Sequence, residues 1–192
     1  MRQTLISDDK VIEELKKAAA ETLAIDVATI KADSSLVKDL GAESLDFLDI
    51  NYRIEQTFAI KMARHFIIEH IEEMFGEGTA LDTDGKLTEK AVNLMRIRLD
   101  TAVEGSTLEA LKPGMDMDAL PAMITIRSMA GSIMDILDTL PENCTECGKS
   151  AWKTENDTHI VCGACGAEAA YKNGDDLIKD WLQKTQDEHK II

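Results

Sequence analysis

The chain has 192 residues, of which 44% are apolar and only 4% aromatic, and its formal net charge is −15. This composition supports a packed core made of small helical units and argues against an aromatic-rich β-sandwich. So acidic a chain repels phosphate backbones, which excludes nucleic acid as the main partner and favours basic protein surfaces. No apolar run is long enough for a membrane span, and the first ten residues lack the apolar run of a signal peptide, so we expect a cytoplasmic protein.

Apolar residues recur at helical spacing along most of the chain, which predicts a mostly α protein. A long connection, residues 24–43, follows the first helix and carries apolar residues that we expect to anchor it in the core. A last helix is expected after Asp175 or Asp176, which are good capping residues. The other predicted helices cover about 9–23, 44–58, 63–75, 89–103 and 122–140.

The helix predicted at 44–58 has two faces of different character. One is apolar and consists of Phe47, Ile50, Ile54 and Phe58. The other mixes apolar and acidic groups and consists of Leu45, Leu48, Asp49, Tyr52 and Glu55. The second face is either scatter around an amphipathic helix or a docking surface for a partner with an apolar centre and a basic rim.

A serine stands at the head of this helix, in the run Asp39-Leu40-Gly41-Ala42-Glu43-Ser44-Leu45-Asp46. The structural interpretation of Ser44 is a helix N-cap. The chemical interpretation is a serine that carries a phosphate ester, because a helix N-terminus offers free N–H groups and the positive end of the helix dipole. No histidine lies beside Ser44 and the Gly-x-Ser-x-Gly pattern is absent, which argues against a serine nucleophile.

The run from Asp39 to Asp46 resembles the attachment motif of acyl carrier proteins, which is usually written Asp-Ser-Leu at its centre. The likeness continues downstream through Ile54-Glu55-Gln56-Thr57-Phe58, and upstream through Ile30, Asp33 and Leu36. Glu43 stands where the family usually has Asp, which keeps the charge. The resemblance implies that Ser44 carries 4′-phosphopantetheine and that an acyl group is held as a thioester on its terminal thiol.

The resemblance also implies a four-helix bundle that can shelter an acyl chain, with Ile50, Ile54 and Phe58 as candidates for its interior. Its implied partners are a phosphopantetheinyl transferase and acyl synthase or transferase enzymes with basic docking surfaces. Leu45, Leu48, Asp49, Tyr52 and Glu55 would meet these enzymes.

Two segments compete for the last helix of the carrier fold. Ile124-Thr125-Ile126-Arg127-Ser128-Met129-Ala130 resembles its usual start, and Leu87-Thr88-Glu89-Lys90-Ala91-Val92 is the competitor. We prefer the former, so we expect a carrier domain at 1–140 with an enlarged helical middle at about 63–120. The insertion either widens the acyl pocket, binds a dedicated partner, or only adds core.

Four cysteines form two Cys-x-x-Cys pairs, Cys144/Cys147 and Cys162/Cys165, and Gly148 and Gly166 follow the second cysteine of each pair. Two such pairs supply four thiolates for a tetrahedral Zn²⁺ site, and short strands are expected between them. The pattern resembles a zinc ribbon, so we expect a zinc-binding module with a C-terminal helix at 141–192. Disulfides are one alternative, and a reducing cytoplasm disfavours them. A redox Cys-x-x-Cys is the other, and it would need one pair at a helix start rather than two matched turns.

The histidines form no ligand pattern in the sequence, because His65 and His70 are five residues apart and share a helical face poorly. We therefore predict a non-enzymatic acyl carrier of fatty acid, specialised lipid or polyketide synthesis. The alternative is a zinc-ribbon interaction or regulatory protein with a degenerate carrier fold. A peptidyl carrier is less consistent with Gly41-Ala42-Glu43-Ser44, since that type usually shows Gly-Gly-x-Ser. The sequence contains no acid–base pair, open metal site or phosphate loop, so an enzyme is the function it supports least.

Overall fold

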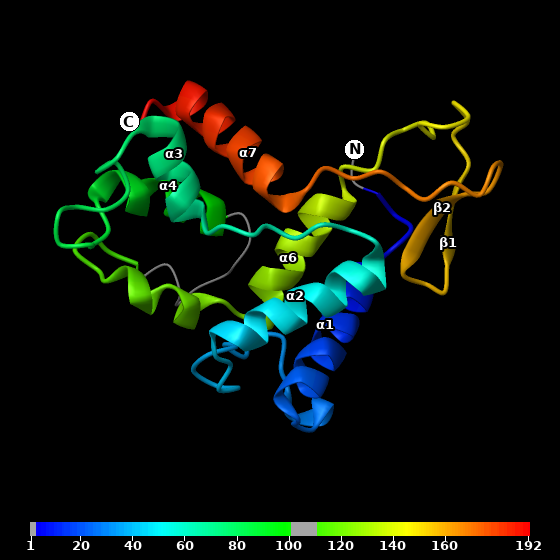
Figure 1. Ribbon diagram of the computed structural model, residues 1–192, viewed down its shortest axis with the longest axis horizontal. Helices are drawn as coiled ribbons and strands as arrows, with labels where there is room; N and C mark the ends of the chain where they lie inside the picture. The colour runs from blue at the N-terminus through cyan, green and yellow to red at the C-terminus, as the bar shows by residue number, and fades with distance from the viewer. Residues whose placement is uncertain (1–2, 101–110) are drawn as a thin grey trace. The chain divides into compact units, whose positions relative to one another are not determined.

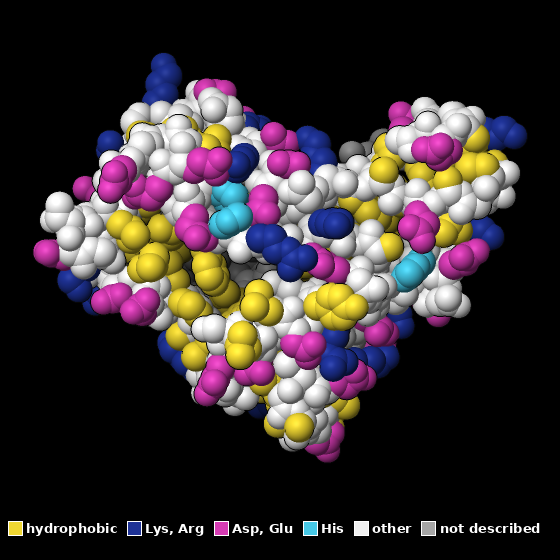
Figure 2. Space-filling view, in the orientation of Figure 1, with side chains coloured by type: hydrophobic (Ala, Val, Ile, Leu, Met, Phe, Trp, Pro, Cys, Tyr) yellow, Lys and Arg dark blue, Asp and Glu magenta, His cyan; other side chains and the backbone are white. Residues whose placement is uncertain are grey.

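The computed structural model describes residues 3–100 and 111–192 (Figure 1). The chain divides into two compact units. The first unit comprises Met1–Met62 and Thr125–Gly174, and the second comprises Ala63–Ile124 and Asp175–Ile192. Acidic side chains are spread over much of the face shown in Figure 2, as the net charge requires.

Three long helices build the helical part of the first unit: α1 (Asp8–Leu23), α2 (Ser44–Phe58) and α6 (Ile126–Leu137). Helix α1 contacts both α2 and α6. Ser7 caps α1 by accepting a hydrogen bond from the Lys10 N–H at 3.2 Å, so the cap lies just before the acidic pair of its first turn. The arrangement buries the apolar face of each helix against its neighbours.

The connection between α1 and α2 contains one short 3-10 helix, η1 (Val27–Thr29). Ile30 and Leu36 anchor it, with 1% and 0% of their surface exposed, whereas Val27 stays 42% exposed. The connection also contacts the start of α6, because the backbone N–H of Ile126 donates to the Ser34 carbonyl at 3.1 Å. Thr125 is the N-cap of α6 and accepts a hydrogen bond from the Ser128 N–H. The helix after Thr125, which is the preferred candidate for the last helix of the carrier fold, contacts α1.

A two-stranded antiparallel hairpin, β1 (Trp152–Glu155) and β2 (His159–Cys162), belongs to the same unit. The Trp152 indole N–H donates to the Pro141 carbonyl at 2.7 Å. His159 Nε2 lies 3.1 Å from the Gln56 carbonyl oxygen near the end of α2. The hairpin therefore packs with the helices of the first unit.

The second unit has its own apolar core. It contains α3 (Ile67–Phe75), α4 (Glu89–Asp100), the short helices η2 (Met117–Ala119) and η3 (Pro121–Met123), and α7 (Gly174–His189), which begins at the last residue of the first unit. The predicted end of the fourth helix at about 103 lies outside the described residues. The core of this unit includes the buried side chains of Ile68, Ile71, Leu87, Val92, Leu94, Leu111 and Leu182.

The predicted mostly α fold with a small hairpin is confirmed, and the four-helix arrangement stays a prediction. The division into units differs from the expected boundary at residue 140. The segment 141–174 groups with the first unit through the hairpin contacts, and the C-terminal helix groups with the second unit because Leu182 is part of its core. Among residues 3–100 and 111–192, every helix is too short or too polar to cross a membrane.

Candidate functional site

Ser44 is the first residue of α2, and its side chain is exposed. The N-cap position belongs to Glu43, whose backbone is extended with φ −104° and ψ 174°. The structural interpretation of Ser44 as the N-cap is thus displaced by one residue. An exposed hydroxyl in the first turn is accessible to a modifying enzyme, and it lies at the positive end of the helix dipole.

The acidic residues on both sides of Ser44 organise the start of the helix. The Asp46 carboxylate accepts a hydrogen bond from the Glu43 backbone N–H at 2.7 Å. This contact is the returning half of a capping box, in which a side chain of the third helical residue satisfies a backbone donor at the cap. Asp46 therefore fixes the entry of the chain into α2, and with it the position of Ser44.

The residues before Ser44 form a tight turn that is anchored in the core. Gly41 has φ +74°, a conformation that glycine adopts without strain. The next residue, Ala42, is buried and its N–H donates to the Leu36 carbonyl at 2.8 Å. Asp39 accepts a hydrogen bond from the Ser35 backbone N–H at 2.7 Å. The turn thus holds Ser44 at the surface while its own backbone is tied to the connection.

Three members of the predicted partner face are exposed apolar side chains on α2. Leu45 is 77% exposed, Leu48 56% and Tyr52 59%. They follow Ser44 at helical spacing, so they form one strip along α2 that starts at the serine. We refer to these three residues as the α2 strip.

The two acidic members of the predicted face behave differently from each other. Asp49 is partly exposed and accepts hydrogen bonds from the Arg53 Nε at 2.8 Å and from the Thr22 hydroxyl at 2.6 Å. The bond from Arg53, helped by Thr22, holds the pKa of Asp49 below its ordinary value. Glu55 is only 9% exposed, and its carboxylate accepts the Met62 backbone N–H at 2.9 Å. The prediction that Glu55 belongs to an open docking face is therefore wrong, because the chain after α2 folds back over it.

The predicted interior residues lie where the sequence indicated. Ile50, Ile54 and Phe58 each have 0% of their surface exposed. An acyl chain could enter this part of the first unit only if these side chains moved apart, since protein interiors are close-packed.

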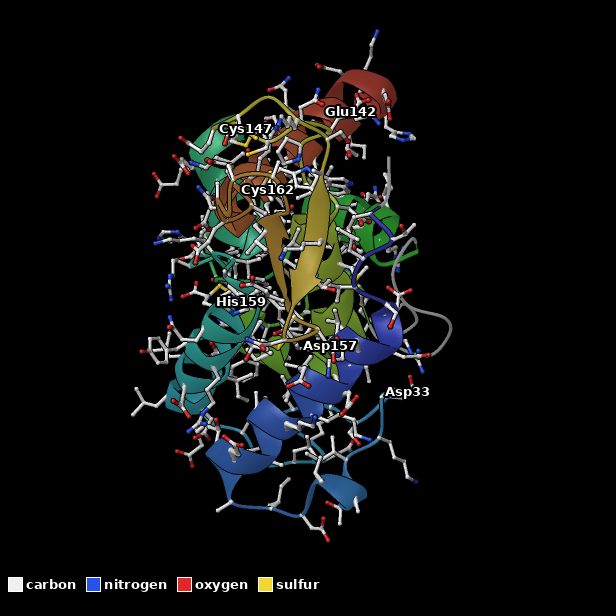
Figure 3. All side chains as sticks on the ribbon, turned by 90° about the vertical axis from the view of Figure 1, so that its right-hand side faces the viewer. Asp33, Glu142, Cys147, Asp157, His159 and Cys162 are labelled. Atoms are coloured by element: carbon white, nitrogen blue, oxygen red, sulfur yellow. The ribbon has the colours of Figure 1, made fainter. Side chains whose placement is uncertain are left out.

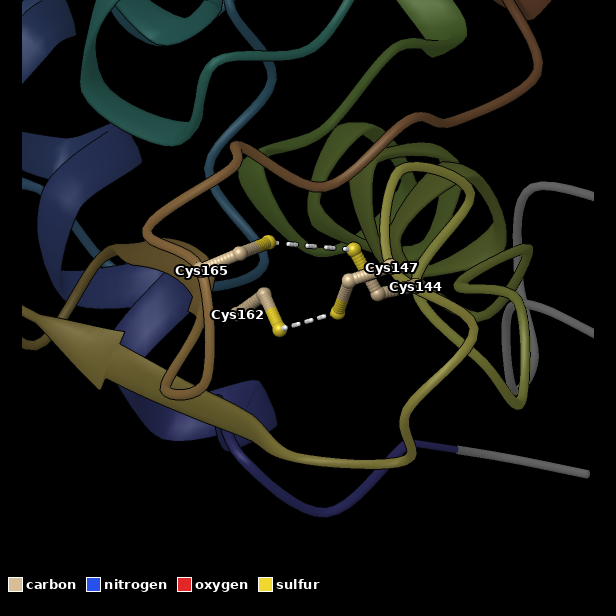
Figure 4. Close-up of side chains that lie close together, drawn as sticks. All are labelled: Cys144, Cys147, Cys162 and Cys165. Carbon is tan, nitrogen blue, oxygen red and sulfur yellow. Dashed lines mark hydrogen bonds between the residues drawn. The ribbon is translucent and has the colours of Figure 1, made fainter.

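The four cysteines converge at one end of the hairpin. All four sulfur atoms lie within 4.8 Å of one another. The Sγ atoms of Cys144 and Cys165 are 3.7 Å apart, and those of Cys147 and Cys162 are 3.6 Å apart (Figure 4). Four thiolates around one Zn²⁺ ion at about 2.3 Å have their sulfurs about 3.8 Å apart, whereas a disulfide needs about 2.0 Å. The spacing fits a metal and not a pair of disulfides.

Two matching turns present these thiols. The Gly148 N–H donates to the Cys144 carbonyl and the Gly166 N–H donates to the Cys162 carbonyl, both at 2.8 Å. Both glycines have positive φ, +70° and +78°. In Figure 3, Cys147 and Cys162 lie at one end of the hairpin and Asp157 at its opposite turn. Backbone hydrogen bonds thus hold the two cysteine turns in matching form.

The backbone also adjusts the acidity of the thiols. The N–H of Ala164, with that of Cys165, lowers the pKa of the Cys162 thiol to about 7. The N–H of Ala167 lowers the pKa of Cys165, but the surrounding thiols outweigh it and raise that pKa to about 12. Since a thiolate and not a thiol binds zinc, the lowered pKa of the Cys162 thiol favours the form that can bind a metal.

Sequence reasoning missed a further cluster. His65, His70 and Asp175 each offer a donor atom, and these atoms lie within 4.8 Å of one another. The histidines form no ligand pattern in the sequence, but the fold brings Asp175, 105 positions from His70 along the chain, against them. No local spacing could have indicated it.

Comparison with known proteins defines the class of this chain. Residues 13–74 match the family model described as "Phosphopantetheine attachment site", and this range contains Ser44. The acyl carrier protein of Clostridium acetobutylicum is 42% identical over 52 residues, which is 27% of this chain and 68% of that protein. The acyl carrier protein AcpXL of Mesorhizobium japonicum is 44% identical over 50 residues, and that of Rhizobium meliloti is 54% identical over 43. No solved structure matches the chain.

The chain belongs to the acyl carrier protein family, whose members are carriers and not enzymes. Its similarity is confined to a part of the molecule. The aligned segment covers 26% of this chain and 54% of the Mesorhizobium protein, and 22% of this chain and 45% of the Rhizobium meliloti protein. The family match ends within α3, so the cysteine cluster lies outside it.

Proposed function

We propose that this protein carries acyl intermediates as thioesters on a 4′-phosphopantetheine group attached to Ser44. The observation that carries the proposal is the exposed Ser44 hydroxyl at the start of α2, within the run Asp39–Asp46 and inside the family match. The prosthetic group, when attached, supplies a long arm that ends in a thiol. The protein's own residues position the attachment point and present a surface beside it.

The first turn of α2 suits a phosphodiester. Its N–H groups point out of the helix start, where the helix dipole favours an anion. The backbone at this point is fixed by the Asp46–Glu43 contact and by the anchored turn at Gly41 and Ala42. An attachment site held in this way gives the arm a defined origin while leaving the serine side chain open to a transferase.

The α2 strip is proposed as the surface that partner enzymes read. Leu45, Leu48 and Tyr52 are large, exposed and near Ser44, and two acidic residues, Asp46 and Asp49, lie between them along a chain of net charge −15. Partners with an apolar contact and a basic rim fit this surface, which is the reason to name a phosphopantetheinyl transferase and acyl synthase or transferase enzymes. The acyl chain belongs to fatty acid, specialised lipid or polyketide synthesis rather than to an amino-acid-loading pathway, because Ala42 stands where peptidyl carriers usually have a second glycine.

The cysteine cluster is proposed as a structural Zn²⁺ site. Four thiolates complete a tetrahedron and leave no position open for water, so the ion would stabilise the hairpin without catalysing a reaction. Because the hairpin contacts the end of α2 through His159 and Gln56, the site would act within the same unit as Ser44. A second candidate function is that of a zinc-centred interaction protein. The two matching cysteine turns favour it.

Intact mass spectrometry tests both proposals on the full chain after co-expression with a phosphopantetheinyl transferase. Under denaturing conditions the wild type should gain the mass of one phosphopantetheine, and Ser44→Ala should lose it. Ser150→Ala, another exposed serine, is the matched control and should be modified like the wild type. Under native conditions the bound zinc should add to the mass, and Cys147→Ser should bind one zinc fewer than the wild type. Absence of the prosthetic group despite a competent transferase would overturn the carrier proposal and leave the zinc-centred candidate.

A further inference from the structure

Two histidines and an aspartate meet in the second unit, outside both sites described above. His65 precedes α3, His70 lies in α3 and Asp175 lies in the first turn of α7. His70 Nε2 is 2.9 Å from Asp175 Oδ1, and His65 Nδ1 is 3.5 Å from the same oxygen. The two imidazole rings meet edge to face with centroids 5.7 Å apart. Two imidazole nitrogens and one carboxylate oxygen, each able to bind a metal ion, therefore lie within 4.8 Å of one another.

The His70 ring lies between two carboxylates. Its ring is only 2% exposed, Nε2 faces Asp175 and Nδ1 faces Glu73 Oε2 at 3.5 Å. Nδ1 is buried and makes no hydrogen bond within the described part of the chain. A neutral imidazole has a proton on one nitrogen and a lone pair on the other. With the proton on Nε2, the ring donates to Asp175 and the buried Nδ1 has no partner, whereas with a metal ion on Nε2 the proton on Nδ1 faces Glu73.

Both carboxylates beside His70 are held in their charged form. Asp175 is partly desolvated, but the backbone N–H groups of Arg64 and His65 and the ring of His70 outweigh that effect and lower its pKa. Lys179 donates to the Glu73 carboxylate at 2.8 Å and is the largest cause of its lowered pKa. Two negatively charged groups therefore face the His70 ring.

A metal ion uses features of this cluster that a second proton on His70 would not. A proton on His70 Nε2 needs only Asp175 as its partner. A metal ion would also use His65 Nδ1, which lies 3.5 Å from the same carboxylate oxygen. Ligands of a tetrahedral ion at about 2.0–2.1 Å lie about 3.3–3.4 Å apart, close to the 3.5 Å between His65 Nδ1 and Asp175 Oδ1. The shorter contact from His70 would lengthen by about half an ångström as the ion replaces its hydrogen bond. Asp175 Oδ1 also accepts the backbone N–H of His65 at 3.1 Å and that of Arg64 at 3.2 Å, so the ion would take the place of the His70 contact on this oxygen.

Glu73 completes the pattern expected around a metal-bound histidine. Such histidines almost always donate their second ring N–H to a carboxylate or carbonyl, which fixes the tautomer and the ring orientation. With an ion on Nε2, the His70 proton resides on Nδ1 and faces Glu73. The His65 side chain is 59% exposed, so an ion can reach the cluster from solvent and a water can occupy a fourth position.

We propose that His65 Nδ1, His70 Nε2 and Asp175 Oδ1 bind one divalent transition metal ion, such as Zn²⁺ or Ni²⁺. Two imidazoles and one carboxylate suit these ions and suit Mg²⁺ or Ca²⁺ poorly. The ion would join the start of α3 to the start of α7 across 105 residues of chain. This site is separate from the carrier function, and its three-ligand nitrogen and oxygen set is distinct from the four-thiolate cluster.

The test uses the full chain with its cysteine cluster loaded with zinc and weakly bound metal removed. Ni²⁺ is then titrated by calorimetry. We expect one additional saturable equivalent, a weakening of at least about tenfold in His65→Ala, and loss of the equivalent in Asp175→Asn. His189→Ala removes an exposed histidine of the same unit and should bind like the wild type. His65 is exposed, so its substitution should leave the fold intact, which circular dichroism checks.

A second measurement separates the metal from a proton. Side-chain ¹⁵N spectra of His70 should show Nδ1 protonated and Nε2 shifted when Zn²⁺ is added to the zinc-loaded protein. If both nitrogens are protonated and Zn²⁺ leaves them unchanged, the cluster is an imidazolium held between two carboxylates and the proposal is wrong. Equal Ni²⁺ binding by wild type and His65→Ala would overturn it as well.

Discussion

The Glu55 carboxylate accepts the backbone N–H of Met62 at 2.9 Å, so the last turns of α2 are tied to the chain that leaves them. Both residues are buried, at 9% and 7% exposed. Ala59 ends α2 in the left-handed conformation with φ +53°, which turns the chain back toward Glu55. The contact thus satisfies a buried backbone donor in the segment between α2 and the second unit.

Removing this acceptor should destabilise the first unit. Glu55→Ala leaves the buried Met62 N–H without this partner, which costs about 1–3 kcal/mol in the free energy of unfolding. Glu55→Gln is the matched control, because its amide oxygen can still accept the bond, and it should lose less. Urea unfolding of the three proteins measures the difference, and equal stability of Glu55→Ala and wild type would contradict the assigned role.

A charge on the α2 strip should impair partner enzymes without affecting stability. Leu48 is 56% exposed, so Leu48→Glu removes little buried surface and should leave the melting temperature unchanged. Its replacement should lower kcat/KM of the phosphopantetheinyl transferase by about tenfold, the loss expected for an apolar residue at the centre of an interface. Val27→Glu alters another exposed apolar residue, 42% exposed in η1, and serves as control. A similar loss in both variants would indicate a general charge effect and not a docking strip.

Removal of metal from the cysteine cluster should loosen the hairpin. Without a cation, the four cysteine sulfurs at 3.6–3.7 Å lose the ion that would hold them together, and the two cysteine turns should separate. The Trp152 indole, which now donates to the Pro141 carbonyl, should then be more exposed. Its fluorescence should shift to the red on chelation in a Trp181→Phe background, and zinc should reverse the shift. An unchanged spectrum after complete zinc removal would show that the hairpin does not depend on the metal.

Asp49 should titrate below its ordinary carboxyl pKa of 3.8. The cause is the hydrogen bond from Arg53, which favours the charged form, with a further contribution from Thr22. A lowered pKa in the folded state means that the interaction stabilises the protein above pH 3.8 and is lost as the pH falls through the folded value. An NMR titration of the side-chain carboxyl measures this directly, and Arg53→Met should return the pKa toward 3.8. A midpoint at or above 3.8 in the wild type would contradict the contact.

The sequence by itself determined the features that depend on local spacing. The run Asp39–Asp46 located Ser44 at the head of a helix, and helical periodicity identified Ile50, Ile54 and Phe58 as interior residues. The two Cys-x-x-Cys pairs with their following glycines indicated two matched turns and a hairpin between them. These predictions succeeded because capping, amphipathic periodicity and turn glycines are consequences of residues a few positions apart.

Only the tertiary structure decided which distant segments meet. Glu55 reads as a surface acid on the helical wheel, yet the backbone of Met62 covers it. The C-terminal helix follows the cysteines in sequence, but its Leu182 completes the core of the second unit. His65 and His70 gain meaning only when Asp175, far along the chain, is brought against them. Burial and long-range contacts depend on how whole elements pack, and no local pattern of residues specifies that packing.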